Sequence, residues 1–433
     1  MAAAAQRKTK LLPIGVFDSG TGGLTVLEQL LLVDVMNNTT GELKSDGIPD
    51  LQAEAFQYLA DQANMPYGNY AAVQKTDLLR EQIAENMQFF LSKNRKLPVK
   101  IIVLACNTAT AYALDSIKKS FTANGVQIPV LGVIEAGAKA ALQHQKLQPG
   151  TIGIFATAGT VASKGYPTIL QQMAASEGVT SKLFFVEQGG VGLAESIDKD
   201  ASFISDTATK IRLQYKGPAL AHAQLPIQDS LLKVYHFDTS RNALLCEYND
   251  GLQCVNMQLN SAENYTKFHL VTMLEKLRLQ NDTPPLTSLV LACTHYPYMR
   301  TTIEQTLAFL YNYQENNIYR YRHVMMPSIA IIDPAVETAK QCVFLLQKNQ
   351  LLQNRGSVAP SHTFYMKVPA SNIPSELVQA DGWLQYNYKY GRQVGDANYL
   401  TIVPFSKKYI SLETRNRIEA ALPKVASIVT YND

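Results

Sequence analysis

Two cysteines have the sequence surroundings of acid/base groups. Cys106 ends the apolar run IIVLAC and Cys293 ends SLVLAC, and each is followed by small hydrogen-bonding residues, Asn-Thr and Thr-His. A lone free cysteine is usually a small buried apolar group, but two in matching positions favour chemistry. One thiolate can remove a proton from a carbon while the other, as a thiol, delivers a proton to the opposite face. The pair predicts inversion at a carbon atom, for which no cofactor is formally required.

Other polar residues also follow apolar runs. Asp18 opens the glycine-rich turn DSGTGG, where its carboxylate would repel a phosphate and suits an ammonium group or a role in orienting a thiol. Residues 66–68, Pro-Tyr-Gly, would offer backbone N–H groups to a carboxylate. His295 lies two residues beyond Cys293, so its imidazole can reach the same site from the same loop.

Short apolar runs that alternate with helical patterns must position these residues. Continuous rather than alternating hydrophobicity is typical of parallel strands buried on both faces. The predicted strands are Leu12–Phe17, Ile101–Cys106, Pro129–Ile134, Ile152–Thr157, Ser288–Cys293 and Ile329–Asp333, and the predicted amphipathic helices include Asp77–Leu91, Ala136–His144 and Ala335–Gln347. The pattern predicts a doubly wound α/β protein with its active site beyond the carboxyl ends of the strands.

A faint internal repeat suggests two related halves. IGVFDSGT resembles IGIFATAGT, and VLACNTA resembles VLACTHY. If a pseudo-twofold axis relates the halves, the strand ends that carry the two cysteines face each other across a cleft. The second half contains an insertion at about 201–285, where an alternating stretch around Asn-Asp-Gly predicts a β-hairpin.

Composition excludes several classes of protein. The chain has 433 residues, of which 46% are hydrophobic and 17% charged, and its net charge of +3 is too small to indicate nucleic-acid binding. No apolar stretch has the length of about 18 residues that a membrane span needs. Five cysteines, an odd number, predict reduced thiols and a cytoplasmic protein. Cys246 and Cys254 flank the predicted hairpin, where we expect a structural role. The chain shows no Cys/His spacing that predicts a zinc site.

The motifs together resemble a known family. IGVFDSGTGGLTV, MPYG, VLACNTAT, PVLGVIEAG, ATAGTVASKGY and VLACTHYP, in this order, are similar to motifs of the cofactor-independent glutamate racemases of the aspartate/glutamate racemase superfamily. The resemblance covers roughly residues 12–297 and returns at IIDPAVETAK. It implies two pseudosymmetric, doubly wound α/β domains with mainly parallel sheets and the amino acid enclosed between them. The expected divisions are residues 11–133 with 296–350, residues 134–295 including the insertion, and a C-terminal extension, 355–433, of unknown role.

The resemblance also implies roles for individual residues. Cys106 would take the α-proton from the D-enantiomer and Cys293 from the L-enantiomer, with Asp18, His295 and Glu195 in support. Where the family commonly has Cys-Pro before the supporting glutamate, this chain has Gly189-Gly190. The expected substrate contacts are Asp18, Ser19, Pro66, Tyr67, Gly68, Asn107, Thr108, Thr160, Thr294 and His295.

The expected activity is interconversion of L- and D-glutamate, which would supply D-glutamate for peptidoglycan. The partner is the amino acid, with no metal, nucleic acid or membrane, and family analogy raises a homodimer as an option. Three alternatives stay open. The substrate could be aspartate or another amino acid, the chain could be a non-catalytic binding or regulatory descendant, or Cys293 and His295 could serve a hydrolase, which would leave Cys106 unexplained.

Overall fold

The computed structural model describes residues 9–91, 98–179, 181–280, 282–353 and 360–433. The chain forms two compact units. Unit 1 comprises Met1–Ala138, Ala162–Gly165 and Asp333–Asp433, and unit 2 comprises Lys139–Val161 and Tyr166–Ile332. Each unit contains one large sheet with helices on it.

Unit 1 has a six-stranded sheet in the order β14-β13-β2-β1-β3-β4. All neighbours pair in parallel except β13 and β14, which are antiparallel. The bounds are β1 Ile14–Asp18, β2 Phe56–Ala60, β3 Ile101–Leu104, β4 Val130–Gly132, β13 Thr363–Pro369 and β14 Leu400–Pro404. Every residue of β1 to β4 is buried, as expected for a parallel sheet covered on both faces.

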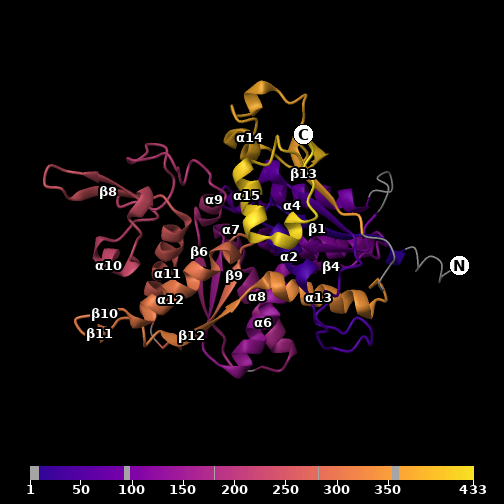
Figure 1. Cartoon of the computed structure of the whole chain (residues 1–433), viewed down its shortest axis with the longest axis horizontal. Coiled ribbons are helices and arrows are strands. Elements are labelled where there is room, and N and C mark those ends of the chain that lie inside the picture. The colour runs from indigo at the N-terminus through magenta and orange to yellow at the C-terminus, as the bar shows by residue number, and fades with distance from the viewer. Residues whose placement is uncertain (1–8, 92–97, 180, 281, 354–359) are drawn as a thin grey trace. The chain divides into compact units, whose positions relative to one another are not determined.

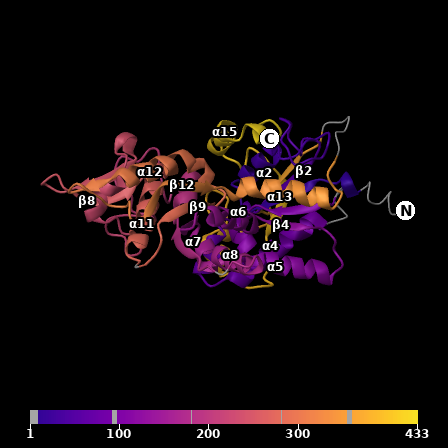
Figure 2. The ribbon, with the colours of Figure 1, turned by 90° about the horizontal axis from the view of Figure 1, so that it is seen from below.

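Helices surround this sheet. Their bounds are α2 Leu24–Leu32, α3 Gly68–Ala72, α4 Thr76–Leu91, α5 Asn107–Ala123, α13 Pro334–Lys348, α14 Tyr386–Gly391, α15 Leu412–Ala421 and α16 Pro423–Ala426. Helix α13 packs against α2, and α4 against α5 (Figure 2). The predicted helices correspond to α4, α6 and α13, with ends shifted by a few residues.

Unit 2 has a four-stranded sheet, all parallel, in the order β12-β9-β5-β6. Its strands are β5 Thr151–Ala156, β6 Phe184–Gly189, β9 Leu286–Ala292 and β12 Met325–Ile332. Its helices are α9 Leu193–Ile197, α10 Leu232–Tyr235, α11 Ala262–Arg278 and α12 Arg300–Asn312, with α8 Gly165–Ser176 from its second residue on. Helices α6 Val133–Leu147 and α7 Ala158–Ser163 are divided between the units. The predicted α/β class with two mainly parallel sheets is therefore confirmed.

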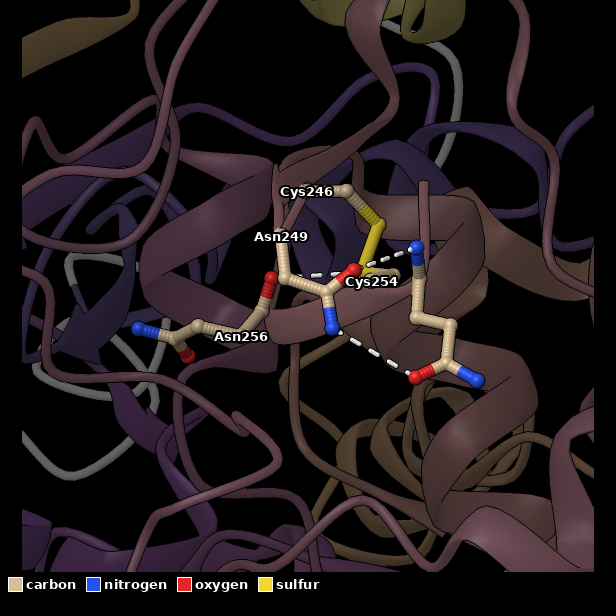
Figure 3. Close-up of a disulfide and its surroundings, with 5 residues drawn as sticks. Cys246, Asn249, Cys254 and Asn256 are labelled. Atoms are coloured by element: carbon tan, nitrogen blue, oxygen red, sulfur yellow. Dashed lines mark hydrogen bonds between the residues drawn. A yellow bond between two sulfur atoms is a disulfide. The ribbon is translucent and has the colours of Figure 1, made fainter. Parts of the chain in front are cut away.

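The insertion contains the predicted hairpin, formed by the antiparallel strands β7 Leu244–Tyr248 and β8 Cys254–Leu259 (Figure 1). A second small hairpin pairs β10 Gln314–Glu315 with β11 Ile318–Tyr319. The expectation that all cysteines are reduced is wrong for one pair, because Cys246 and Cys254 form a disulfide (Figure 3). The turn brings their Cα atoms to 5.5 Å, which is within bridging range. Asn249 Oδ1 fixes this turn by accepting hydrogen bonds from the N–H groups of Gly251 and Gln253.

The division of the chain differs from the expected one in two respects. Residues 296–332, expected in the first domain, belong to unit 2, where β12 is an edge strand beside β9. The C-terminal extension is part of unit 1, because β13 pairs with β2 and β14 forms the sheet edge. Its expected first residues, 355–359, lie outside the described residues. Among the described helices, none combines the length and apolar character required to cross a bilayer.

Candidate functional site

In unit 1, two predicted site residues and Asp61, which was not predicted, lie at the carboxyl ends of three adjacent strands. Asp18 is the last residue of β1, Asp61 directly follows β2, and Cys106 follows β3 by two residues. The sheet order β2-β1-β3 makes these ends neighbours, and this edge of a parallel sheet is where ligands bind in doubly wound folds.

Cys106 is the N-cap residue of α5 and its side chain is buried. Its Sγ accepts a hydrogen bond from the N–H of Ala109 at 3.4 Å, and its thiol donates to Ser19 Oγ at 3.7 Å. Burial and then the charge of Asp18 raise the pKa of the Cys106 thiol to about 12, against the opposing effect of these hydrogen bonds. The resting group is a protonated thiol. Asn107 and Thr108 are buried in the first turn of the same helix.

The DSGTGG turn is fixed by its own carboxylate. Asp18 Oδ2 accepts hydrogen bonds from the N–H groups of Gly20 and Gly23, both at 3.0 Å. A Cβ at Gly23 would lie 2.4 Å from the Asp18 Cβ, so only glycine allows this close approach. The turn therefore holds Asp18 and Ser19 beside Cys106.

The Pro66–Gly68 segment follows a cis Met65–Pro66 peptide and leads into α3. The Tyr67 phenol donates to Asp61 Oδ2 at 2.6 Å, and Asn64 and Asn86 also donate to the Asp61 carboxylate. Burial and the Asp61 charge raise the pKa of Tyr67 well above its ordinary value. Because the phenol is bonded inside the protein, a contact between this segment and a substrate carboxylate would use backbone N–H groups.

In unit 2, Cys293 directly follows β9, and its side chain is buried. His295 Nδ1 lies 3.8 Å from Cys293 Sγ, and His295 Nε2 lies 2.9 Å from Asp198 Oδ2. Burial lowers the pKa of His295, but the Asp198 carboxylate outweighs it and holds this pKa well above 6.5. The result is an imidazolium beside the thiol, which would stabilise a thiolate.

Sequence reasoning selected Glu195 and did not select Asp198, whose carboxylate is the one hydrogen-bonded to His295. Both belong to the segment GLAESID, and Asp198 is the C-cap residue of the short helix α9. Glu195 interacts with His295 through charge alone, and burial raises the pKa of Glu195 to about 7. A carboxylate three residues after Glu195 lies on the same helical face, and this spacing was the available signal.

Two further features order the strand ends of unit 2. Thr157 Oγ1 and Thr160 Oγ1 are 3.0 Å apart just beyond β5. The Tyr296 hydroxyl donates to the carbonyls of Ala156 and Gly190, and a Cβ at Gly190 would lie 2.2 Å from that hydroxyl. Gly190 therefore allows Tyr296 to tie β5 to the segment after β6. Thr294 lies between Cys293 and His295 in the same loop.

The predicted residues thus form one cluster in each unit. Unit 1 joins Asp18, Ser19 and Cys106, with Tyr67 held by Asp61. Unit 2 joins Cys293 and His295, with Asp198 as the added member. Among the described residues, no three His, Cys, Asp or Glu side chains are arranged to hold a metal ion.

Comparison with known proteins shows which proteins the chain resembles. The model of the Asp/Glu/hydantoin racemase family matches residues 70–212. The glutamate racemase of Oceanobacillus iheyensis is 25% identical over 352 residues, which cover 81% of this chain and 85% of that protein. The chain is thus similar to the Asp/Glu/hydantoin racemase family and to glutamate racemases. Its other relatives include the glutamate racemase of Streptococcus agalactiae, 38% identical over 169 residues, 39% of this chain and 52% of that protein.

A solved member of the superfamily is also similar. It is the glutamate racemase of Francisella tularensis in complex with D-glutamate, at 21% identity and a TM-score of 0.48, over 85% of this chain and 90% of that one.

Proposed function

We propose that this chain is a glutamate racemase that interconverts L- and D-glutamate with two thiols. The observation that carries the proposal is that Cys106 and Cys293 each lie, buried, at the carboxyl end of a strand in its own parallel sheet. The relatives that align with most of the chain are named glutamate racemases, which supports glutamate as the substrate.

The proposed reaction moves one proton at each face of the α-carbon. With D-glutamate, the Cys106 thiolate takes the α-proton and becomes a thiol, while the Cys293 thiol gives its proton to the opposite face and becomes a thiolate. L-glutamate reacts in the reverse direction. The S–H bond formed at one cysteine balances the S–H bond broken at the other, so no other reactant is consumed.

The two thiols receive different support in this proposal. The His295 imidazolium, held by Asp198, stabilises the Cys293 thiolate. Cys106 has the backbone N–H of Ala109 and the Ser19 hydroxyl, but also the opposing charge of Asp18. The substrate's ammonium group, paired with Asp18, would offset that charge and lower the pKa of Cys106 when substrate is bound. Exclusion of water would strengthen these interactions.

The unit 2 cluster also favours a second candidate, a hydrolase. In thiol hydrolases a cysteine nucleophile, a histidine base and an orienting carboxylate lie in a row, and Cys293, His295 and Asp198 have this arrangement. We rank this function lower because it gives no role to Cys106. Racemisation of aspartate is a third candidate, since pocket shape decides side-chain length.

We place the reaction in the cytoplasm, where its D-glutamate would serve peptidoglycan synthesis, and propose a homodimer by family analogy alone. Disulfides are uncommon in that compartment. Thiol labelling of Cys246 and Cys254 in freshly lysed cells would therefore test the location.

The function is tested by incubating the chain with each enantiomer of glutamate and of aspartate, followed by chiral chromatography. We expect conversion of either glutamate enantiomer to an equal mixture. Conversion of aspartate alone would keep the mechanism and change the substrate. Conversion of neither amino acid would contradict the proposal.

A further inference from the structure

The C-terminal extension contacts the segment that carries Tyr67. Lys389 Nζ donates to the carbonyl of Met65 at 2.7 Å, and the Tyr390 hydroxyl donates to the carbonyl of Pro66 at 3.2 Å. Both residues lie on α14, more than 300 positions along the chain from the segment they contact. Tyr390 is buried against Tyr70, with ring centroids 4.8 Å apart.

These bonds determine where the next backbone donor points. The carbonyl of Pro66 and the N–H of Tyr67 belong to one planar trans peptide and point in opposite directions. By fixing the Pro66 carbonyl, Tyr390 therefore fixes the direction of the Tyr67 N–H. That N–H is one of the groups proposed to receive the substrate's carboxylate.

Arg392 is linked to the other end of Tyr67, its phenol, through two intermediate side chains. Its guanidinium is buried, and Nη2 donates to Asn64 Oδ1 at 2.7 Å. Asn64 in turn donates from Nδ2 to both oxygens of Asp61, which accepts from the Tyr67 phenol. The buried Arg392 cation and the buried Asp61 anion thus lie on either side of the Asn64 amide. This arrangement offsets the cost of burying either charge alone.

One nitrogen of the Arg392 guanidinium has unused hydrogen-bond donors. Its Nη1 is buried, with no hydrogen-bond partner among the residues that the structure describes, although a buried donor of this kind is normally satisfied. The position of the guanidinium is otherwise fixed by the carbonyl of Lys389 and by the Tyr388 ring. Lys75 Nζ donates to the Arg392 carbonyl at 3.1 Å and holds this part of the extension to the core of unit 1.

We propose that residues 389–392 of the extension are part of the substrate site of this racemase. Tyr390 and Arg392 act as positioning residues, which orient Tyr67 and Gly68 toward a carboxylate of the amino acid without touching it themselves. The inference rests on the proposed function. It assigns a role to a segment that lies beyond the racemase motifs.

The test uses the full chain with Tyr390→Phe, Arg392→Met and the conservative Arg392→Lys. Two matched controls come from the same extension. Tyr386→Phe alters the ring that packs on Tyr390, and Arg415→Met alters an arginine that contacts Tyr431. Each variant is measured by steady-state kinetics with both glutamate enantiomers and by amide hydrogen exchange of the peptide spanning residues 61–72.

We expect Arg392→Met to raise KM about tenfold in both directions and Tyr390→Phe to raise it about threefold, with kcat within about twofold of wild type. Arg392→Lys should recover part of the loss. Exchange in residues 61–72 should be faster in Arg392→Met and unchanged in both controls. Loss of folding alone would lower the active fraction and hence kcat, so the change in KM separates positioning from stability. Tyr390→Phe keeps the test usable if Arg392→Met does not fold.

Unchanged exchange in residues 61–72 would overturn the inference, as would faster exchange with an unchanged KM. A wild-type chain that racemises no glutamate would instead refute the proposed function. The exchange data alone would then decide whether residues 389–392 hold the Tyr67 segment.

Discussion

Cys106 and Cys293 occupy equivalent places in their two units but have different electrostatic surroundings. Cys106 lies beside a carboxylate, Asp18, and its pKa is raised to about 12. Cys293 lies beside an imidazole whose pKa is held well above 6.5 by Asp198. The two matching strand-and-loop positions thus differ in the charge that lies beside the cysteine.

This difference suggests that bound substrate supplies the positive charge missing beside Cys106, whereas the cluster around Cys293 already has one. The unit 2 cluster already contains a cation beside its thiol. The unit 1 cluster contains an anion, and it becomes balanced only when an ammonium group pairs with Asp18. In the proposed mechanism, Cys106 is therefore a base only with substrate bound.

The largest expected effect comes from removing either thiol. Cys106→Ala and Cys293→Ala should each lower kcat/KM by at least about 10³-fold in both directions, because each turnover uses both groups. Chiral chromatography of the products measures the loss. Cys342→Ala is the matched control, since Cys342 is the third free cysteine among the described residues and is buried in α13. A variant that retains either direction at the wild-type rate would show that the two clusters do not act together.

The next effect concerns the charge beside Cys293. His295→Asn should lower kcat/KM about 10²-fold and Asp198→Asn about tenfold. The fall must be equal in the two directions, because the equilibrium constant between enantiomers is one. The control is Asp206→Asn, an exposed carboxylate that pairs with Lys199.

The pH dependence of Asp198→Asn sharpens this comparison. Asp198 raises the pKa of His295, so the stabilisation from this pair is fully present below pH 6.5 and is lost as the pH rises through the folded-state pKa. Without the carboxylate, burial should lower the pKa of His295, so the imidazolium should lose its proton, and kcat/KM should fall, at lower pH than in wild type. Identical pH profiles for the two proteins would remove His295 from its proposed role.

The smallest expected effect is on stability, through Glu195, which has no counterpart in the unit 1 cluster. Its pKa of about 7, raised from 4.5, means that the folded protein holds a proton which the unfolded chain releases. Stability should therefore fall as the pH rises from 4.5 through 7, by about 3 kcal/mol. Glu195→Gln should abolish this decrease, measured by urea unfolding at pH 5 and pH 8. A decrease of equal size in the variant would assign it to other groups.

The sequence predicted most of the parallel strands because buried strands have a continuous apolar pattern. It missed β13, which pairs in parallel with β2 although 302 residues lie between Ala60 and Thr363 in the chain. Pairing of this kind depends on tertiary contacts rather than on local pattern. The Cys246–Cys254 disulfide was missed for a different reason, since an odd cysteine count carries no information about a single pair across a hairpin.

The grouping of the candidate residues was predictable where motifs place them at strand ends, as for Asp18, Cys106 and Cys293. Asp198 was not selected, because its role depends on which side of α9 lies near His295. Arg392 was not selected either, because its contact with Asn64 joins positions 328 residues apart. A residue whose role is to position another side chain through a tertiary contact has no recognisable motif in a single sequence.

The central claim is that two thiols act on opposite faces of one α-carbon, and proton NMR of the reaction in D₂O tests it most directly. Either glutamate enantiomer is supplied in protiated form and the reaction is stopped at low conversion. The account predicts product that carries deuterium at the α-carbon and unreacted substrate that keeps its α-proton. Deuterium in the remaining substrate, or protium carried into the product, would indicate a single base and contradict the account.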